Sequence, residues 1–531
     1  MERSFNGFAI ISESKFINSF HALLTYATEV KITHNKEIYA ELSLEEEIKE
    51  LYFNFTLDAY NKTLLQQIKE KNAHFLGLFT SSVATGIFLN EYSTFTTVSD
   101  YIIFLLKINW ITFLPAFIFY NLGVYYLFKE NDNLIDINKI VNNKNKLDNK
   151  KIIFQITSLG FNIESIKTSL NSVIYWKNII KKKFNININS SIWIVIEEFY
   201  YNKFKKEYEM IQKINKEINL IIVPSNYQTK NSTKFKARAL NYSCEIRKQL
   251  GLANKDVWIY FQDEETCVGE DTILGILEFI IDAEDKYFLG NGIILYPLDF
   301  ENTSIHAQEL IRTGNEDIKN LFWQKVKKIP LFGYHGSHFL VRSDIEAEIG
   351  WDFGICRAED WLFHIKVAEK YGKVVSYMKG FAYEKSPYTL MDRLKQRRRW
   401  ILGNFDIIKR KDISLKFKLP IYYSIFLLYF PIPSLLLAAL ATLYTNIGMF
   451  PFSFLVGFMW FTMLRNYILS YNLHSRYLDK TKIKIYSLLI NWIKGAVIEV
   501  INPWYALIKR VYSYEVINKD KKQRLKYILK I

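Results

Sequence analysis

The apolar positions of the chain form long runs near both ends and short runs in the middle. Near the N-terminus, residues 75–90 form a short apolar stretch and residues 101–128 a long one, interrupted only by Lys107. A helix needs about 20 apolar residues to cross a bilayer. The long stretch therefore predicts a membrane span, and we expect the short one to pair with it. Two buried helices of a soluble fold are the alternative.

The middle of the chain alternates between short apolar runs and helical patterns. The helical patterns cover residues 163–183 and 236–250. The apolar runs predict four strands, at residues 152–160, 191–198, 218–224 and 256–265. This alternation predicts an α/β, Rossmann-like domain with a mostly parallel sheet. Ligands bind such sheets at the carboxyl ends of the strands, where the sequence places Thr157, Glu197, Glu198 and Asp263.

Three further apolar stretches follow, at residues 419–450, 451–473 and 485–507. The last contains Lys494 and Glu499, so it predicts either a span or a helix lying in the membrane interface. Lys and Arg clusters flank the apolar stretches, and the positive-inside rule places such flanks in the cytoplasm. The sequence therefore predicts an integral, multi-pass membrane protein whose α/β domain faces the cytoplasm.

These patterns divide the chain into seven segments. They are a polar preamble (1–73), two N-terminal transmembrane helices (74–128), a solvated linker rich in Asn, Lys and Asp (129–150), the α/β domain (151–387), an interfacial helix segment (388–418), C-terminal transmembrane or interfacial helices (419–515) and a basic tail (516–531). The preamble carries charges throughout, which is not typical of a signal peptide.

Charge and composition narrow the choice of partners. The 531 residues carry a net charge of +15, with 50% hydrophobic and 23% charged residues, as expected of a water-soluble unit joined to membrane segments. Nucleic acid, anionic lipid or a phosphate-bearing substrate would each match the positive charge, and compositional drift would also produce it. The basic clusters mostly flank apolar segments, which favours membrane lipid, and we expect no nucleic acid partner. Three scattered cysteines without a CxxC pair exclude a zinc ribbon and favour a reducing compartment.

The first candidate for chemistry is the acidic sequence that ends the fourth predicted strand. Asp263 and Glu265 flank Glu264, and this D-x-E spacing is suited to a hard divalent ion, Mg²⁺ or Mn²⁺, with a diphosphate completing its coordination. A solvated acidic turn is the alternative.

The second candidate is the sequence Arg357 to Trp361. It contains Asp360 beside aromatic and apolar residues, which raise the pKa of a carboxyl group and suit a general base. An acidic helix N-terminus would show the same letters.

The third candidate is the basic sequence from Asp392 to Trp400. On a helix, Gln396, Arg399 and Trp400 share one face, while we expect the other arginines to point elsewhere. An arginine and an amide suit a pyrophosphate leaving group, and an indole offers a flat surface to a sugar ring. A basic helix resting on anionic lipid is the alternative.

In order and spacing, the three sequences together resemble the membrane-anchored, inverting family 2 glycosyltransferases, which include cellulose, chitin and hyaluronan synthases. The chain is most similar to the egghead-type β-1,4-mannosyltransferases over about residues 150–410. The resemblance is carried by FKARALNY (235–242), DEET (263–266), HGSHFLVR (335–342), AEDWLF (358–363) and YEKSPYTLMDRLKQRRRW (383–400). It implies a GT-A-type catalytic domain inserted between N- and C-terminal transmembrane helices.

The resemblance also implies a role for each candidate residue. Asp360 would be the base, and Asp263 and Glu265 would hold the metal. The donor would be bound by Thr157, Glu197 or Glu198, Lys236, Arg238, Asp263, Gln396 and Arg399, and the acceptor by His335, Gly336, Ser337, Glu359 and Trp400. This chain departs from the wider family at two positions. The acid at the strand end is Glu rather than the usual Asp. The residue before the E-D sequence is Ala358, as in egghead-type proteins, whereas the synthases have Thr there.

The implied reaction is an inverting transfer of a hexose from a nucleotide sugar to a hydroxyl of a glycolipid or saccharide acceptor. GDP-mannose is the favoured donor and a UDP-hexose the alternative. A processive polysaccharide synthase would need enough C-terminal spans to form a channel. A membrane binding or transport protein is the alternative from another class, although the apolar segments contain few of the paired charges that transporters use.

Overall fold

The computed structural model describes residues 55–89, 95–129, 131–283, 286–298, 300–444, 449, 451–478 and 484–508. The basic tail at 516–531 and the first 54 residues of the preamble lie outside this range.

One mixed sheet of eight strands forms the centre of the α/β domain. Its order is β3-β2-β1-β4-β7-β6-β8-β5. The strands are β1 (Lys151–Thr157), β2 (Ser190–Glu197), β3 (Ile218–Val223), β4 (Val257–Asp263), β5 (Cys267–Val268), β6 (Leu289–Leu298), β7 (Phe339–Arg342) and β8 (Val375–Lys385). The first four strands in chain order pair in parallel, β7 is antiparallel to both its neighbours, and β6 pairs in parallel with β8. A mostly parallel sheet is what the alternation of strands and helices predicts.

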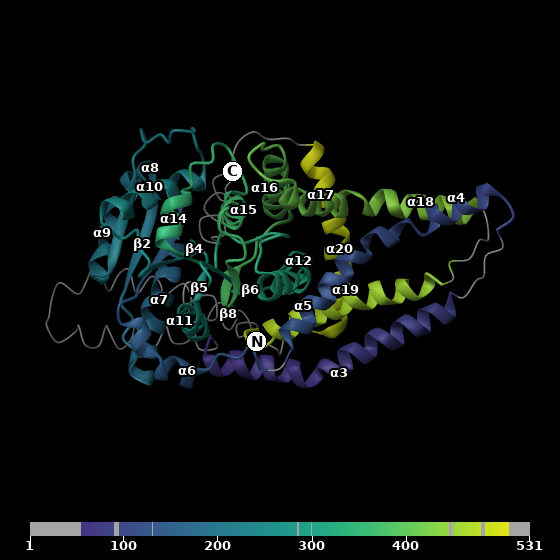
Figure 1. Cartoon of the computed structure of the whole chain (residues 1–531), viewed down its shortest axis with the longest axis horizontal. Coiled ribbons are helices and arrows are strands. Elements are labelled where there is room, and N and C mark those ends of the chain that lie inside the picture. The colour runs from purple at the N-terminus through teal and green to yellow at the C-terminus, as the bar shows by residue number, and fades with distance from the viewer. Residues whose placement is uncertain are drawn as a thin grey trace, which may run out of the picture.

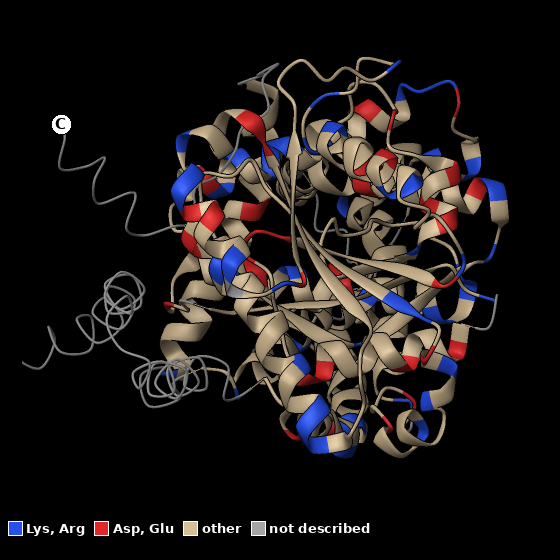
Figure 2. Ribbon diagram, turned by 90° about the vertical axis from the view of Figure 1, so that its left-hand side faces the viewer, with Lys and Arg blue, Asp and Glu red and all other residues tan. Residues whose placement is uncertain are grey.

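Helices cover both faces of the sheet, which explains why its strands are apolar along their whole length. Phe154 and Ile156 of β1 face a core that includes helices α7 and α11, while Ile153 faces a second core that includes α10, α14 and α15. The helices of the domain are α7 (Ile163–Phe184), α8 (Glu198–Lys203), α9 (Lys205–Ile214), α10 (Lys236–Gln249), α11 (Glu270–Ala283), α12 (Ser304–Arg312), η3 (Thr313–Asp317), α13 (Ile318–Phe322), η4 (Trp323–Lys327), α14 (Ser343–Ile349), α15 (Glu359–Tyr371) and α16 (Leu390–Ile408). Charged residues of both signs are spread around this domain (Figure 2).

The remaining helices precede and follow the domain in sequence, and most of them extend away from the sheet on one side (Figure 1). They are α3 (Leu57–Phe88), α4 (Val98–Lys107), η1 (Asn109–Phe113), α5 (Leu114–Leu127), α6 (Ile137–Asn142), η2 (Lys144–Leu147), α17 (Leu415–Tyr429), α18 (Pro431–Tyr444), α19 (Ser453–His474) and α20 (Ile485–Ile508). Segments about 370 residues apart meet there, since Ser81 of α3 hydrogen-bonds the Gly457 carbonyl of α19 at 3.4 Å.

Within the described residues, two helical stretches are long and apolar enough to cross a membrane, Asn109–Leu127 and Ile485–Ile508. A third is counted if Leu415–Tyr429 and Pro431–Leu443, which are bent by 55° at their junction, form one span. The predicted stretches at 75–90 and 451–473, which lie in α3 and α19, are not in that set.

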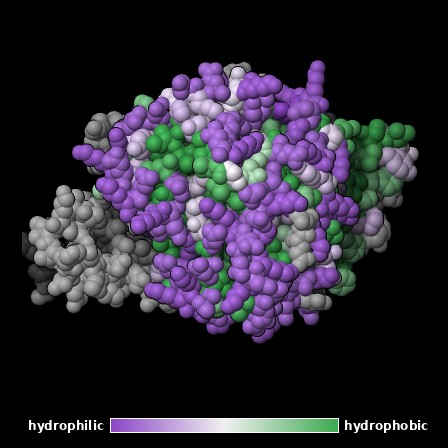
Figure 3. Space-filling view, turned by 60° about the vertical axis from the view of Figure 1, so that its left-hand side comes forward, coloured by the Kyte–Doolittle hydropathy of each residue, from purple (hydrophilic) through white to green (hydrophobic). Residues whose placement is uncertain are grey.

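Large apolar side chains are exposed on the protruding helices. Figure 3 shows this apolar surface at the edge of the molecule, beside the hydrophilic surface of the domain. The exposed side chains include Leu76, Phe79 and Phe88 of α3, Leu105 of α4, Leu435 and Leu443 of α18, and Trp460 of α19. An apolar surface of this extent is stable against lipid rather than water.

Two segments differ from the sequence-based prediction. Helix α3 begins at Leu57 and has 32 residues, so it includes the end of the predicted preamble as well as the apolar stretch. The range 129–150 is not simply a solvated linker. It forms α6 and η2, because Ile135, Ile140 and Leu147 recur among its polar residues and are buried against the domain.

Candidate active site

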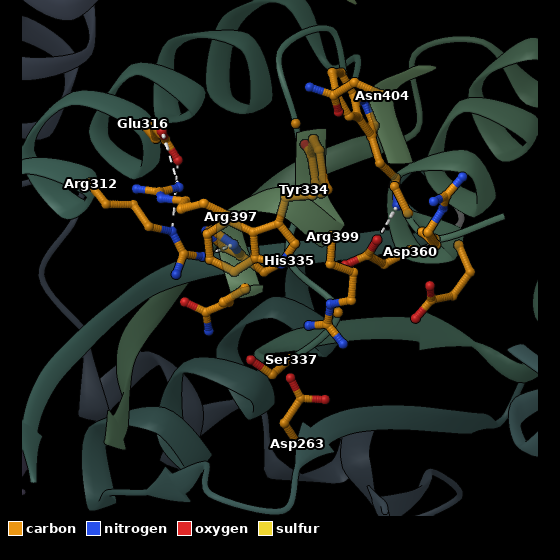
Figure 4. A pocket seen from close by; sticks show the side chains of 18 of the residues that line it. Asp263, Arg312, Glu316, Tyr334, His335, Ser337, Asp360, Arg397, Arg399 and Asn404 are labelled. Carbon is orange, nitrogen blue, oxygen red and sulfur yellow. Dashed lines mark hydrogen bonds and ion pairs between the residues drawn. The ribbon is translucent and has the colours of Figure 1, made fainter. Parts of the chain in front are cut away.

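A cavity of about 540 Å³ lies at the carboxyl ends of the parallel strands. Its walls come from the strand ends, from helices α10, α15 and α16, and from the flanking helices α5, α17 and α20. The domain and the candidate membrane spans therefore enclose one site. Figure 4 shows part of this lining, including Asp263 at the end of β4, Asp360 of α15 and Arg399 of α16.

Residues at the strand ends and at the start of α10 form one end of the cavity. Thr157, Glu197 and Asp263 line it. Lys236, the first residue of α10, forms an ion pair with Asp263 and donates a hydrogen bond to the Gly336 carbonyl at 3.1 Å. Burial opposes the charge of Lys236, but the nearby carboxylates, Asp263 foremost, outweigh it and raise its pKa. Phe235 precedes this lysine with a φ of +63°, a strained backbone of the kind found at functional sites.

Two predicted donor-binding residues are not among the residues that line the cavity. Arg238 pairs with Glu197 at 2.5 Å, and it also hydrogen-bonds the carbonyls of Pro224 and Tyr227. The Glu198 carboxylate accepts a hydrogen bond from the Ser225 backbone at 2.8 Å. Successive residues at a strand end point in different directions, so only Glu197 of the two neighbouring acids reaches the cavity. Arg238 holds this Glu197 carboxylate by their ion pair.

All three carboxylates of the D-x-E sequence line the cavity, but Glu264 is also held by the loop after β1. Glu264 accepts hydrogen bonds from Ser158 and Asn162 in the loop after β1, and burial raises its pKa to about 8. Asp263 and Glu265 both line the cavity and have oxygen ligands of the type that Mg²⁺ and Mn²⁺ prefer. Among the described residues, no three His, Cys, Asp or Glu side chains surround a common point. The pair therefore fits a divalent ion only if ligands from outside the protein complete its coordination.

Glu359 and Asp360, at the start of α15, lie beside Lys236 and Arg399. Burial raises the pKa of Glu359 to about 7, and the charge of Asp360 adds to this effect. Burial also raises the pKa of Asp360, while Lys236 and Arg399 oppose the rise. A Cβ atom at Gly336 would lie 2.8 Å from an Asp360 carboxylate oxygen, so a side chain at position 336 would displace this carboxylate. Asp360 thus has the environment of a general base at the cavity surface.

The residues of the HGS sequence are fixed by hydrogen bonds to other elements. His335 lies between two partners, with its Nδ1 atom accepting from Arg312 at 2.8 Å and its Nε2 atom donating to Asp317 at 2.8 Å. Ser337 donates to Glu384 of β8 at 2.5 Å. All three residues of the sequence line the cavity.

Helix α16 contributes Gln396, Arg397, Arg399 and Trp400 to the cavity wall. The expectation that Arg397 points elsewhere is wrong, whereas Arg398 does so and lies over the Tyr505 ring. The Arg312 and Arg397 guanidinium carbons are 4.6 and 4.8 Å from the Trp400 ring centroid.

The lipid-binding alternative for α16 is wrong for three of its arginines. Arg393, Arg397 and Arg398 are buried inside the protein, and the first two pair with Glu499 of α20. Buried arginines with carboxylate partners are not available to lipid headgroups.

Several lining residues were not predicted from the sequence. They include Tyr120, Arg312, Glu316, Lys319, Glu384, Asn404, Ser424, Leu427, Leu428, Glu499, Asn502 and Pro503. Of these residues, only Glu499 stood out in the sequence, because it is a carboxylate within an otherwise apolar stretch.

With this geometry in place, comparison with known proteins is informative. Residues 258–473 match the family model described as glycosyl transferase family group 2. Over these residues the chain is similar to the family 2 glycosyl transferases. The matched range contains β4 with its D-x-E sequence, Glu359, Asp360 and all of α16, so the resemblance predicted from the motifs is confirmed at the level of the family.

Two curated relatives are similar to part of this chain. The beta-1,4-mannosyltransferase bre-3 of Caenorhabditis elegans is 32% identical over 258 residues, which are 48% of this chain and 55% of the relative. The beta-1,4-mannosyltransferase egh of Drosophila melanogaster is 32% identical over 215 residues, 40% of this chain and 46% of the relative. The chain therefore spans about half the length of the curated relatives it matches.

One similar solved structure is the mannosyltransferase PcManGT of Pyrobaculum calidifontis in complex with GDP-Man and Mn²⁺. The alignment covers 70% of this chain and 99% of the PcManGT chain. The TM-score is 0.40 and the sequence identity 14%.

Proposed function

We propose that the chain is a membrane-embedded glycosyltransferase that transfers a hexose from a nucleotide sugar to an acceptor hydroxyl, forming a β-glycosidic bond. One observation carries the proposal, namely that Asp360, Arg399 and the Lys236–Asp263 pair line the same cavity at the carboxyl ends of parallel strands. Mannose, carried by GDP, is the favoured sugar because the curated relatives are β-1,4-mannosyltransferases. The favoured acceptor is a glycolipid, since apolar side chains of α17 line the cavity.

In the proposed mechanism, the Asp360 carboxylate removes the proton of the acceptor hydroxyl while its oxygen attacks the anomeric carbon of the donor. The bond from that carbon to the diphosphate breaks in the same step, so the configuration inverts. Arg399 and Lys236 offset the negative charge that grows on the departing nucleoside diphosphate. Thr157 and Glu197 hold the base and ribose, and His335, Gly336 and Ser337 border the acceptor.

The direct test is a panel of radiolabelled nucleotide sugars incubated with membranes that contain the protein, followed by lipid extraction. We expect label from GDP-mannose in the lipid phase, as a product one sugar longer than its acceptor. Membranes containing Asp360→Asn serve as the matched control. Absence of lipid- or saccharide-linked label from every donor would reject the proposed activity, and a ladder of long products would indicate a processive synthase.

Activity is expected to depend on a divalent metal. We propose that Asp263 and Glu265 hold it together with the diphosphate, where a bound Mg²⁺ or Mn²⁺ would neutralise charge on the leaving group. Excess EDTA should abolish transfer from metal-free donor, and added Mn²⁺ or Mg²⁺ should restore it. EDTA saturated with Mg²⁺ beforehand is the control. Full activity in excess EDTA would contradict the metal site.

Trp400 is expected to tolerate Phe better than Leu. Its ring lies between two guanidinium groups, and cation–π contacts contribute about 0.5–2 kcal/mol each. Phe keeps an aromatic face, so Trp400→Leu should lose roughly tenfold more transfer activity than Trp400→Phe. Trp460→Leu is a suitable control, because Trp460 is exposed on the apolar surface of α19. Equal activity of both Trp400 variants would argue against a role for the ring.

We further propose that the protein crosses the membrane several times and that the domain faces the cytoplasm, on the basis of the basic flanks. The three native cysteines are buried and therefore report poorly on topology. Cysteine introduced at Leu250, which is 61% exposed at the end of α10, should escape an impermeant thiol reagent in intact cells and react after lysis. Rapid labelling without lysis would refute the orientation.

A further inference from the structure

One turn of helix α20 reaches the cavity from the side of the candidate membrane spans. Glu499, Asn502 and Pro503 line the cavity there, and Leu427 and Leu428 of α17 line the same cavity. Asn502 is only 1% exposed. Polar side chains in a candidate span are costly unless they are paired or functional, so this turn requires an explanation.

The Glu499 carboxylate has its hydrogen bonds inside the protein. One oxygen accepts from Arg393 at 2.9 Å and from Arg397 at 2.6 Å, and the other accepts from the side-chain amide of Asn502 at 3.0 Å. A charged carboxylate only accepts hydrogen bonds, so the NH₂ group of Asn502 must face Glu499. This fixes the amide orientation and directs its Oδ1 atom away from Glu499.

In the described part of the chain, Oδ1 of Asn502 is buried and has no hydrogen-bond partner. A buried amide oxygen without a donor is unfavourable, and such atoms usually have a partner. Pro503 adds a second acceptor to the same turn. Proline has no N–H group, so the carbonyl four residues earlier, at Glu499, receives no helical hydrogen bond from it.

We propose that Asn502 binds a hydroxyl group of the acceptor sugar through Oδ1 and helps to determine which acceptor is used. This inference rests on the proposed function. The turn presents acceptor atoms next to a carboxylate, so it suits a hydroxyl, which donates. It does not suit a phosphate, whose oxygens accept and carry negative charge. The nucleotide end of the cavity, at Thr157 and Glu197, is formed by the strands, which leaves α20 for the acceptor.

The experiment compares wild-type protein with Asn502→Leu, a substitution of similar size that removes the amide. GDP-mannose is the donor, and octyl β-glucoside, β-galactoside and β-mannoside are the acceptors. We expect the KM for the acceptor to rise about 3- to 10-fold, the effect of one hydrogen bond. Hydrolysis of GDP-mannose without acceptor should stay within about twofold, since water needs no contact with Asn502. The KM for GDP-mannose should be equally unaffected.

Asn491→Leu is the matched control. Asn491 lies on the same helix and hydrogen-bonds the Asn302 carbonyl at 2.8 Å, but it is not among the residues that line the cavity. It loses a hydrogen bond of the same kind, so its acceptor KM should remain that of the wild type. Asn502→Ser, which shortens the side chain, provides a second variant in case Asn502→Leu folds poorly.

Monodeoxy acceptors identify the contact. For wild-type protein, removal of one particular hydroxyl should raise the acceptor KM by the same factor as Asn502→Leu does, and the variant should be indifferent to that hydroxyl. An unchanged acceptor KM in an active Asn502→Leu variant would overturn this inference but not the proposed function. A loss of donor hydrolysis as large as the loss of transfer would also overturn it, because it would indicate a structural role for Asn502. Absence of transfer by the wild type to every acceptor would reject the proposed function itself.

Discussion

Replacing Asp360 with Asn is expected to lower sugar transfer by about 10²–10⁴-fold, the usual contribution of a positioned general base. Asn keeps the shape of the side chain but does not accept a proton from the acceptor hydroxyl. The hydrogen bond that its side chain accepts from the Trp361 N–H at 2.9 Å should survive, because the side-chain oxygen of Asn can accept it as well. The measurements are nucleotide binding by calorimetry and sugar transfer, on the same detergent preparation.

Donor affinity should change far less than the rate in Asp360→Asn. Asp360 lies near Lys236, which pairs with Asp263, so a modest change in nucleotide binding is expected from the altered charge. Asp344→Asn is the matched control, since its carboxylate pairs with Arg342 at 2.7 Å outside the cavity. Normal transfer by Asp360→Asn would remove the proposed base.

Glu359, the neighbour of Asp360, also lines the cavity, and burial raises its pKa to about 7. Glu359→Gln should therefore reduce activity, but less than Asp360→Asn. The opposite order would identify Glu359 as the base.

The parts of the site that the sequence predicts correctly lie within single elements. Strand ends are marked by an apolar run that stops at a polar residue, which placed Thr157, Glu197 and Asp263 at one edge of the sheet. Helical spacing likewise placed Gln396, Arg399 and Trp400 on one face. Periodicity is a local property of the backbone, so the spacing of residues in the sequence is enough to predict it.

The residues that escaped prediction are brought to the cavity by packing between distant elements. Glu499 lies 102 residues after Arg397, with which it pairs, and His335 depends on Arg312 and Asp317 of another segment. Arg238 is held outside the cavity lining for a related reason, because it pairs with a neighbouring carboxylate, Glu197. No spacing rule identifies such partners, since they are set by how helices cross rather than by the helices themselves.

Replacing Arg399 with Met is expected to lower kcat by about 10²–10³-fold, similar to the loss of one donor that stabilises developing negative charge. Arg399 lines the cavity beside Asp360, and its charge lowers the pKa of both Asp360 and Glu359 (Figure 4). The variant should therefore lose stabilisation of the leaving diphosphate and also favour protonation of the base. The second effect should shift the acid limb of the pH–rate profile to higher pH, because a carboxyl group with a higher pKa is protonated at higher pH.

Two further variants separate charge from geometry at Arg399. Arg399→Lys keeps the charge but loses the planar, two-pronged donor of guanidinium, so its kcat should fall between wild type and Arg399→Met. Lys395→Met removes a positive charge one turn earlier on α16, outside the residues that line the cavity, and should leave kcat nearly unchanged. Measurement of kcat and nucleotide affinity across pH distinguishes the outcomes. If Arg399→Met weakened nucleotide binding while kcat at saturating donor stayed normal, Arg399 would bind the ground state only, and charge on the departing diphosphate would have to be stabilised by Lys236 and the metal.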